Sequence, residues 1–175
     1  MKRIATTAWI ASLLLSATAC TPDATERNKE LVRRMTVAIN DRNFDALDGL
    51  VAEDVHRHSA ATPMVTVENL DQFKEFLRQD LSAVPDAQQE INLMLAEDDL
   101  VAVHATYRGT QTGQMGPFPP SDNALELPFV GILRIENAKI AEIWVEWDNL
   151  NALTQLGHFP PPAGSAGSSA EPKTE

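Results

Sequence analysis

The chain has 175 residues, of which 43% are hydrophobic and 22% are charged, and these proportions fit one soluble domain with a core of its own. A multidomain protein is excluded at this length. Its 14 Lys and Arg residues stand against 25 Asp and Glu residues, which gives a net charge of −11. Such an acidic balance repels phosphate groups, so we expect no nucleic acid as a partner.

The first residues have the features of a secretory signal. A basic start is followed by an apolar stretch up to Leu15, and the small residues 17–19 stand directly before Cys20. The apolar stretch is interrupted by polar residues and is short for a membrane span, so we expect residues 1–19 to be removed as a signal peptide. Removal of Lys2 and Arg3 would change the net charge from −11 to −13.

Cys20 is the only cysteine, so the chain cannot form an internal disulfide. The segment ASLLLSATAC resembles a bacterial lipobox, in which the cysteine receives a diacylglyceryl group. This resemblance implies an exported lipoprotein of the bacterial cell envelope, held to the membrane through Cys20. The alternative is an ordinary signal peptide followed by a coincidental cysteine.

Composition divides the rest of the chain into three parts. Residues 20–27 are polar and predict a tether, and residues 158–175 are rich in Pro, Gly, Ser and Ala and predict a disordered tail. One domain is expected over residues 28–157. The order of its predicted elements, helices first and then strands, indicates an α+β fold.

Hydrophobic residues at helical spacing predict the first helix over residues 28–41. A short second helix should follow with Asn43 as its cap. The third should start at Asn69, where Gln72 completes a capping-box-like pair, and end before Pro85.

The hydrophobic period then changes to two. Ile91, Leu93 and Leu95 are expected to share one face of a strand. Further strands are predicted over residues 101–108, 125–136 and 139–148, the last two joined by a tight turn at residues 137–138.

Several strings resemble the SnoaL-like polyketide cyclase and ester cyclase family, which has the nuclear transport factor 2-like fold. They are NKELVRRMTVAINDRNFDALDGLVAEDVHRH, FKEFL, DDLVAVHATYRGTQTG and FVGILRIENAKIAEIWVEWDNLNALTQLG. The resemblance implies a cone, in which a curved antiparallel sheet wraps around the N-terminal helices and leaves an apolar cavity open at one end. It also implies a small hydrophobic ligand, although one such fold can carry many activities.

The resemblance places Asp148 where the family has an aspartate that acts as the acid and base of a ring closure. Alternation along the strand predicts Trp144 and Glu146 on the same face, so that an aromatic ring and two carboxylates would project into the cavity. Burial and mutual repulsion should then raise at least one carboxyl pKa. The alternative is that Asp148 caps a helix beginning near Asn149 and that Glu146 lies at a solvated rim.

The resemblance also places His58 at a cavity position, where it would donate a hydrogen bond or move a proton. Gln111 stands where the family often has a histidine, and an amide can hydrogen-bond but cannot titrate. Tyr107 and Phe129 are expected either to line the cavity or to pack in an ordinary core. No third ligand at a recognisable spacing joins His56 and His58, so we expect neither a metal nor another cofactor.

Our leading hypothesis is a lipid-anchored protein that binds a small apolar carbonyl compound. Asp148 would serve as the acid and base of a cofactor-free cyclisation or isomerisation, with His58 and Gln111 holding the carbonyl oxygen. The rival is a noncatalytic ligand-binding or protein-interaction module of the envelope, which export and the missing histidine favour. The sequence leaves open whether the outer sheet face forms a homodimer through three polar residues: His104, Thr106 and Arg108.

Replacing Cys20 with Ser should release the protein from the membrane fraction, because a serine hydroxyl cannot take the thioether-linked lipid. Mass spectrometry of the wild-type protein should give an amino terminus at an acylated Cys20. Thr21→Ser is the matched control and should leave the protein in the membrane. A wild-type protein that is soluble after export would contradict the anchor.

Overall fold

The computed structural model describes residues 23–160. The predicted signal peptide, Cys20 and the tail beyond Pro160 therefore lie outside the described residues. Within residues 23–160, no helix combines the length and the apolar character that a membrane span requires.

The helices form close to where the sequence predicts them. The first begins at Ala24, earlier than the expected residue 28, so it takes up part of the predicted tether. At the start of this helix, Thr25 Oγ1 donates a hydrogen bond of 2.8 Å to Asp23 Oδ2, and Glu26 complements the dipole of the first turn. The bounds are α1 Ala24–Asn40, the 3-10 helix η1 Phe44–Gly49, α2 Leu70–Ala83 and α3 Asn149–Gln155.

Two predicted caps are confirmed. Asn43 Oδ1 accepts a hydrogen bond from the Ala46 amide at 3.3 Å, at the start of η1. At the start of α2, Asn69 Oδ1 accepts from the Gln72 amide at 2.9 Å, and Gln72 Oε1 accepts from the Glu68 amide at 2.8 Å. These bonds satisfy amide groups that have no partner within the helices.

The strands form a five-stranded sheet in the order β1-β5-β4-β3-β2. The pair β1 and β5 is parallel and the other three pairs are antiparallel. The predicted turn between β4 and β5 is confirmed, since Asn137 and Ala138 have φ of 50° and 60°. The bounds are β1 Val51–His58, β2 Gln88–Glu97, β3 Leu100–Thr110, β4 Ala124–Glu136 and β5 Lys139–Trp147.

A bulge in β2 overturns one expectation. Ile91 is in register with Ala105, but Leu93 is in register with His104, so Asn92 is an extra residue between them. The bulge reverses the alternation, and Leu93 therefore points to the opposite face from Ile91. Thr106 Oγ1 donates to Asn92 Oδ1 at 2.9 Å at this point.

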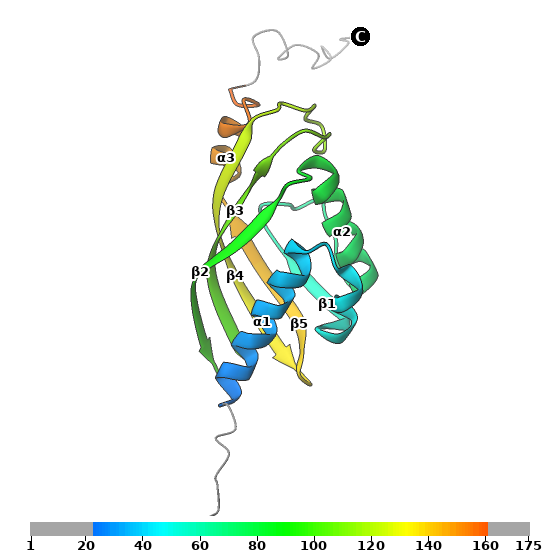
Figure 1. Ribbon diagram of the computed structural model, residues 1–175, viewed down its shortest axis with the longest axis vertical. Helices are drawn as coiled ribbons and strands as arrows, with labels where there is room; N and C mark the ends of the chain where they lie inside the picture. Colours follow the sequence, from blue (N-terminus) through cyan, green and yellow to red (C-terminus); the bar gives the residue numbers. More distant parts are fainter. Residues whose placement is uncertain (1–22, 161–175) are drawn as a thin grey trace, which may run out of the picture.

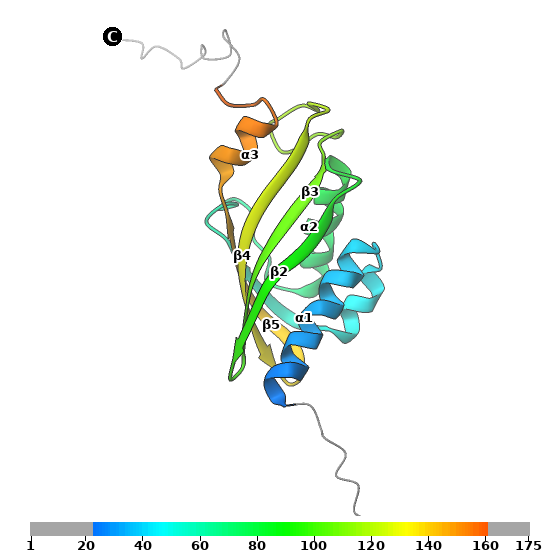
Figure 2. The same cartoon turned by 60° about the vertical axis from the view of Figure 1, so that its left-hand side comes forward.

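Figures 1 and 2 show that α1 and α2 lie against the same face of the curved sheet, so the predicted α+β cone is confirmed. We call the side between the sheet and these helices the interior, and the opposite sheet surface the outer face. The main core lies in the interior and includes Val32, Leu47, Val55, Val101 and Ile140, each at most 1% exposed. α3 lies at the far end of the sheet from the start of α1 (Figure 1).

Gly113→Ala should destabilise the fold by about 1–3 kcal/mol, because a Cβ there would stand 2.0 Å from the carbonyl oxygen of Ser82. Backbone at the end of α2 cannot move aside as a side chain can. Gly49→Ala is the control, since nothing lies within 4 Å of its added Cβ. Urea unfolding of both variants measures the difference, and equal stabilities would contradict this close approach.

Candidate functional site

Asp148 directly follows β5 and caps α3. Its Oδ1 accepts a hydrogen bond from the Asn151 amide at 3.0 Å, and the side chain is exposed. This is the helix-cap geometry that the sequence offered as the alternative. An acid–base role for Asp148 stays a prediction.

Trp144 and Glu146 lie on the outer face, so the expectation that they project into the interior is wrong. A register shift near the start of β5 leaves Ile140 in the core, and from Ile143 onward the odd-numbered residues face the interior, since Ile143 and Val145 pack in the main core and Trp147 in a second cluster. Alternation then turns the even-numbered side chains outward. Asp148 is beyond the strand, where alternation no longer applies.

His58 also lies on the outer face. It is in register with Trp144, and the two rings stack with centroids 5.4 Å apart. His58 Nε2 is 2.8 Å from Glu142 Oε1, and the other oxygen of Glu142 accepts from Arg134 Nε at 3.3 Å. The histidine therefore belongs to a surface cluster instead of lining the interior as expected.

Gln111 is fully buried, and all the hydrogen bonds that its amide can make are internal. Its Nε2 donates to the carbonyl oxygens of Gly113 and Pro119, and its Oε1 accepts from Ser121 Oγ. His158 Nε2 is 2.8 Å from the same Oε1. No hydrogen-bonding capacity remains for a ligand in this arrangement, so the expected role of Gln111 as an oxygen holder has no free group to support it.

The folded domain continues past the predicted boundary at Gly157. The amide of His158 donates to the carbonyl oxygen of Leu153 at 2.8 Å, and its ring stacks on Phe118 at 4.9 Å. His158 is therefore part of the folded domain, and the remainder of the expected tail beyond Pro160 lies outside the described residues.

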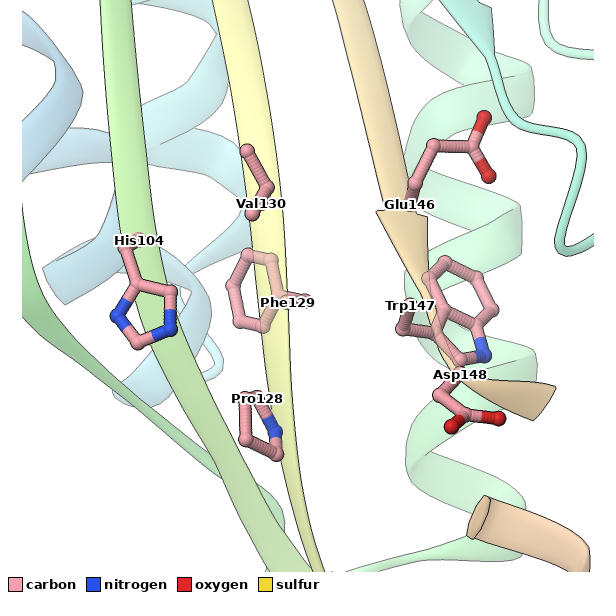
Figure 3. Close-up of a pocket in the computed structure, with 7 residues that line it drawn as sticks. All are labelled: His104, Pro128, Phe129, Val130, Glu146, Trp147 and Asp148. Atoms are coloured by element: carbon pink, nitrogen blue, oxygen red, sulfur yellow. The ribbon is translucent and has the colours of Figure 1, made fainter. Parts of the chain in front are cut away.

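A hollow of about 400 Å³ lies beside the end of β5 (Figure 3). Its polar residues His104, Glu146 and Asp148 do not converge, because the two carboxyl groups point away from the histidine in Figure 3. Glu146 is also engaged elsewhere, since its two oxygens accept from the amides of Ala60 at 2.7 Å and Ala61 at 3.1 Å. Within residues 23–160, no group of three His, Cys, Asp or Glu side chains could hold a metal.

The interior carries a polar pair that the sequence analysis missed. Tyr107 of β3 donates a hydrogen bond of 3.0 Å from its hydroxyl to Oδ2 of Asp80, in the last turn of α2. Burial raises the pKa of Asp80 to about 6, against the opposing effects of the Tyr107 hydrogen bond and the charges of Arg57 and Arg42. Burial is the largest cause of the raised pKa of Tyr107, and the negative charge of Asp80 raises it further.

Arg57 of β1 is the third polar group in this region and is only 7% exposed. Its guanidinium lies 4.3 Å from the ring centre of Phe76 and 5.8 Å from that of Trp147. It donates one side-chain hydrogen bond, to Thr62 Oγ1 at 3.0 Å. Burial lowers the pKa of Arg57, while the charges of Glu146 and Asp80 raise it.

Neither carboxylate forms an ion pair with Arg57 among the described residues, so most of its five N–H donors remain unused. Ser59, two residues further along the chain, adds a second unused group. Its Oγ is fully buried and has no hydrogen-bond partner within residues 23–160. Buried polar groups are normally satisfied, so a polar ligand atom in contact with either group would be stabilised.

Apolar side chains surround this polar group. Phe76 packs on the main core, whereas Tyr107 and Trp147 pack on a second cluster toward α3. The members of that second cluster are Leu125, Leu127, Ala152 and Leu156. An acid with a pKa near neutrality, a cation and aromatic walls can together bind a carbonyl compound and move a proton on it.

A signal for Asp80 was present in the sequence. Asp80 stands seven, four and three residues after Phe73, Phe76 and Leu77, and therefore lies on the apolar face of the predicted helix. Arg57 likewise stands two residues after Val55, on the buried face of its strand. A charged residue on the apolar face of a helix or strand is the sequence signal that identifies both Asp80 and Arg57.

The comparisons agree with this fold. The family model for SnoaL-like polyketide cyclases matches residues 29–156. AclR of Streptomyces galilaeus is 25% identical with a TM-score of 0.68, and the match covers 78% of this chain and 85% of AclR. IdmH of Streptomyces antibioticus is 22% identical with a TM-score of 0.66, covering 74% of this chain and 98% of IdmH.

A SnoaL-like protein from Jannaschia sp. CCS1 is 20% identical with a TM-score of 0.71, covering 80% of this chain and 99% of that protein. The likenesses to IdmH and to this protein show the fold alone. No curated protein matches the sequence.

The raised pKa of Asp80 makes a prediction about stability. The folded chain holds this proton up to a pH of about 6, whereas the unfolded chain releases it near the usual carboxyl pKa of 3.8. This group therefore favours folding most below pH 3.8 and loses the effect as the pH rises through 6. Asp80→Asn does not ionise and keeps an acceptor for Tyr107. Its melting temperature relative to wild type should therefore be higher at pH 7.5 than at pH 4.5.

Asp148→Asn is the control, because Asn caps a helix about as well as Asp. Its melting temperature should stay close to that of wild type at both pH values. If the difference in melting temperature between Asp80→Asn and wild type were the same at pH 4.5 and at pH 7.5, Asp80 would have no raised pKa.

Proposed function

Because the chain belongs to the SnoaL-like polyketide cyclase family, we propose that its interior binds a small, largely apolar carbonyl compound in contact with Asp80, Tyr107 and Arg57. One observation carries the proposal: the Tyr107–Asp80 hydrogen bond lies in the same interior region as a buried guanidinium without an ion pair. Phe76 and Trp147 supply the aromatic walls for the apolar part of the ligand.

In the proposed reaction Asp80 removes a proton from the carbon next to the carbonyl. Oδ1 of Asp80 has no hydrogen-bond partner among the described residues, so it is the oxygen that takes the proton. Arg57 stabilises the negative charge that develops on the carbonyl oxygen. Tyr107 holds Oδ2 and thereby orients the carboxylate. The resulting enolate is the species from which a cyclisation or an isomerisation proceeds.

Asp80 replaces Asp148 as the proposed base for a physical reason. Asp148 is exposed and its Oδ1 is engaged by the Asn151 amide, whereas a base in an apolar interior has a pKa closer to neutrality. For the same reason, we assign the role of holding the carbonyl oxygen to Arg57 instead of His58 and Gln111.

A noncatalytic ligand-binding module of the cell envelope is the second candidate. The observation that favours it is the complete internal bonding of Gln111, which stands where the resemblance implies a titrating histidine. In both candidates we propose export and a lipid anchor at Cys20, supported by the signal-like residues before it. α1 begins at Ala24, so such an anchor would hold the domain close to the membrane.

The test measures the exchange of carbon-bound protons for deuterium. 2-Tetralone, an apolar bicyclic ketone with acidic protons next to its carbonyl, is incubated with the full-length protein in D₂O and followed by NMR. Wild type should accelerate the exchange, and the rate should rise as the pH passes through about 6, because Asp80 must lose its proton to act as a base. Asp80→Asn should lose the acceleration.

Asp148→Asn is the matched control and should exchange as wild type does. Quenching of Trp147 fluorescence by 2-tetralone, measured with Trp144→Phe to remove the second tryptophan of the domain, reports binding independently. Binding without exchange would leave the noncatalytic module standing. Loss of exchange in Asp148→Asn instead of Asp80→Asn would restore Asp148 as the base.

A further inference from the structure

The interior contains a positive charge that no contacting carboxylate balances among the described residues. Arg57 is buried, and the two carboxylates whose charges act on it, Asp80 and Glu146, form no ion pair with it. Asp80 Oδ2 accepts from the Tyr107 hydroxyl, and both oxygens of Glu146 accept from backbone amides of the loop after β1. The fold thus directs both carboxylates to other partners, so the counter-ion of Arg57 has to come from a ligand.

The unused polar groups at this end of β1 are hydrogen-bond donors. A guanidinium has five N–H groups and no acceptor, and that of Arg57 donates one bond, to Thr62 Oγ1. Ser59 comes directly after β1, and its buried hydroxyl is a further donor without a partner within residues 23–160. Unsatisfied buried donors favour a ligand that is rich in acceptor oxygens. A ketone offers one such oxygen, whereas a carboxylate offers two and carries a negative charge.

A carboxylate also suits the surroundings of the guanidinium. Cζ of Arg57 lies over the ring of Phe76, and this contact offsets part of the charge through the π-electrons. The ring provides no oxygen for the remaining N–H groups, whereas a carboxylate accepts two parallel N–H bonds from one guanidinium. The guanidinium has already lost most of its hydration on folding. Binding the anion therefore requires desolvation of the anion alone.

In the function proposed above, Arg57 also holds the carbonyl oxygen of the ligand. One guanidinium contacts a carbonyl oxygen and a carboxylate together when the two groups are neighbours, as they are in a 2-oxo acid. Building on that function, we propose that the ligand is an aryl-substituted 2-oxo carboxylic acid. Its carboxylate and 2-oxo oxygens bind Arg57, and its aromatic group packs beside Phe76 and Trp147.

The enolisation of such an acid balances without another reactant. The C3–H bond breaks and its proton bonds to Oδ1 of Asp80. The electron pair of that bond forms the C2=C3 double bond, and the carbonyl π pair moves onto the oxygen held by Arg57. The carboxylate is unchanged, so it contributes to affinity, whereas the charge developing on the 2-oxo oxygen is stabilised in the transition state.

The experiment compares two ligands that differ in this carboxylate: 2-oxo-4-phenylbutanoate and 4-phenyl-2-butanone, in which a methyl group replaces it. Binding to the full-length protein is measured by quenching of Trp147 fluorescence, with Trp144→Phe in every sample. NaCl at about 0.15 M screens the long-range repulsion between the acid and the acidic protein. The acid should bind at least about tenfold more tightly than the ketone, because hydrogen bonds between charged groups are stronger than those to a neutral oxygen.

Arg57→Met should abolish this preference, since Met keeps an apolar side chain against the aromatic rings but has no charge. Arg33→Met is the matched control, because it removes one positive charge from an exposed position on α1, and it should keep the preference. Thermal unfolding of both variants checks the fold. Arg57→Met should melt no lower than wild type, because it removes a buried charge that has no ion pair. If Arg57→Met does not fold, the two affinities of the wild type decide the question without it.

Equal affinities of the wild type for the two compounds, or a preference that survives in a folded Arg57→Met, would overturn the proposal. Deuterium exchange at C3 of each compound separates this failure from that of the proposed function. If 4-phenyl-2-butanone binds and exchanges in an Asp80-dependent manner while the acid binds no more tightly, the proposed function stands and the 2-oxo acid is wrong. If neither compound binds to the wild type or exchanges on it, both proposals are wrong.

Discussion

The pairing of β5 with both β1 and β4 determines what the interior contains. β5 joins the parallel pair of the sheet to its antiparallel part, and its register with β4 places Trp147 opposite Phe129. That register turns Trp147 toward Arg57 and leaves Trp144 to stack on His58 outside. A shift of one residue would exchange the two tryptophans, and with them the chemistry of the two faces.

The interior region around Arg57 illustrates how a fold retains polar groups at a cost to its stability. A buried guanidinium without a contacting carboxylate loses hydration that one hydrogen bond to Thr62 does not replace. Two aromatic rings compensate in part through their π-electrons. Asp80 is similarly held in surroundings that disfavour its charged form. Such arrangements are typical of binding and catalytic sites, where the ligand supplies the missing interactions.

Local patterns in the sequence predicted most of the fold, because helix caps and tight turns depend on nearby residues. Asn69 with Gln72, and Asn137 with Ala138, are examples in which the signal and the structure coincide. The faces of the strands were harder to predict. One extra residue at Asn92 reverses the alternation of β2, and the residue types around it do not reveal the bulge. The candidate site shifted for a related reason. A resemblance carries a residue's position along the chain, but the direction of its side chain depends on register.

The loop of residues 59–66 contributes no buried residue to either core cluster, although it adjoins Arg57 and includes the unpartnered Ser59. It is held to the last strand and α3 by polar contacts: Glu146 accepts from the Ala60 and Ala61 amides, and Asn149 Nδ2 donates to the Ala61 carbonyl. Each such bond contributes about 0.5–3 kcal/mol, far less than the core as a whole. The free energy that opens this segment is therefore separate from that of global unfolding. Glu146 lies outside the interior, yet its two hydrogen bonds contribute to the free energy that opens the segment next to Arg57.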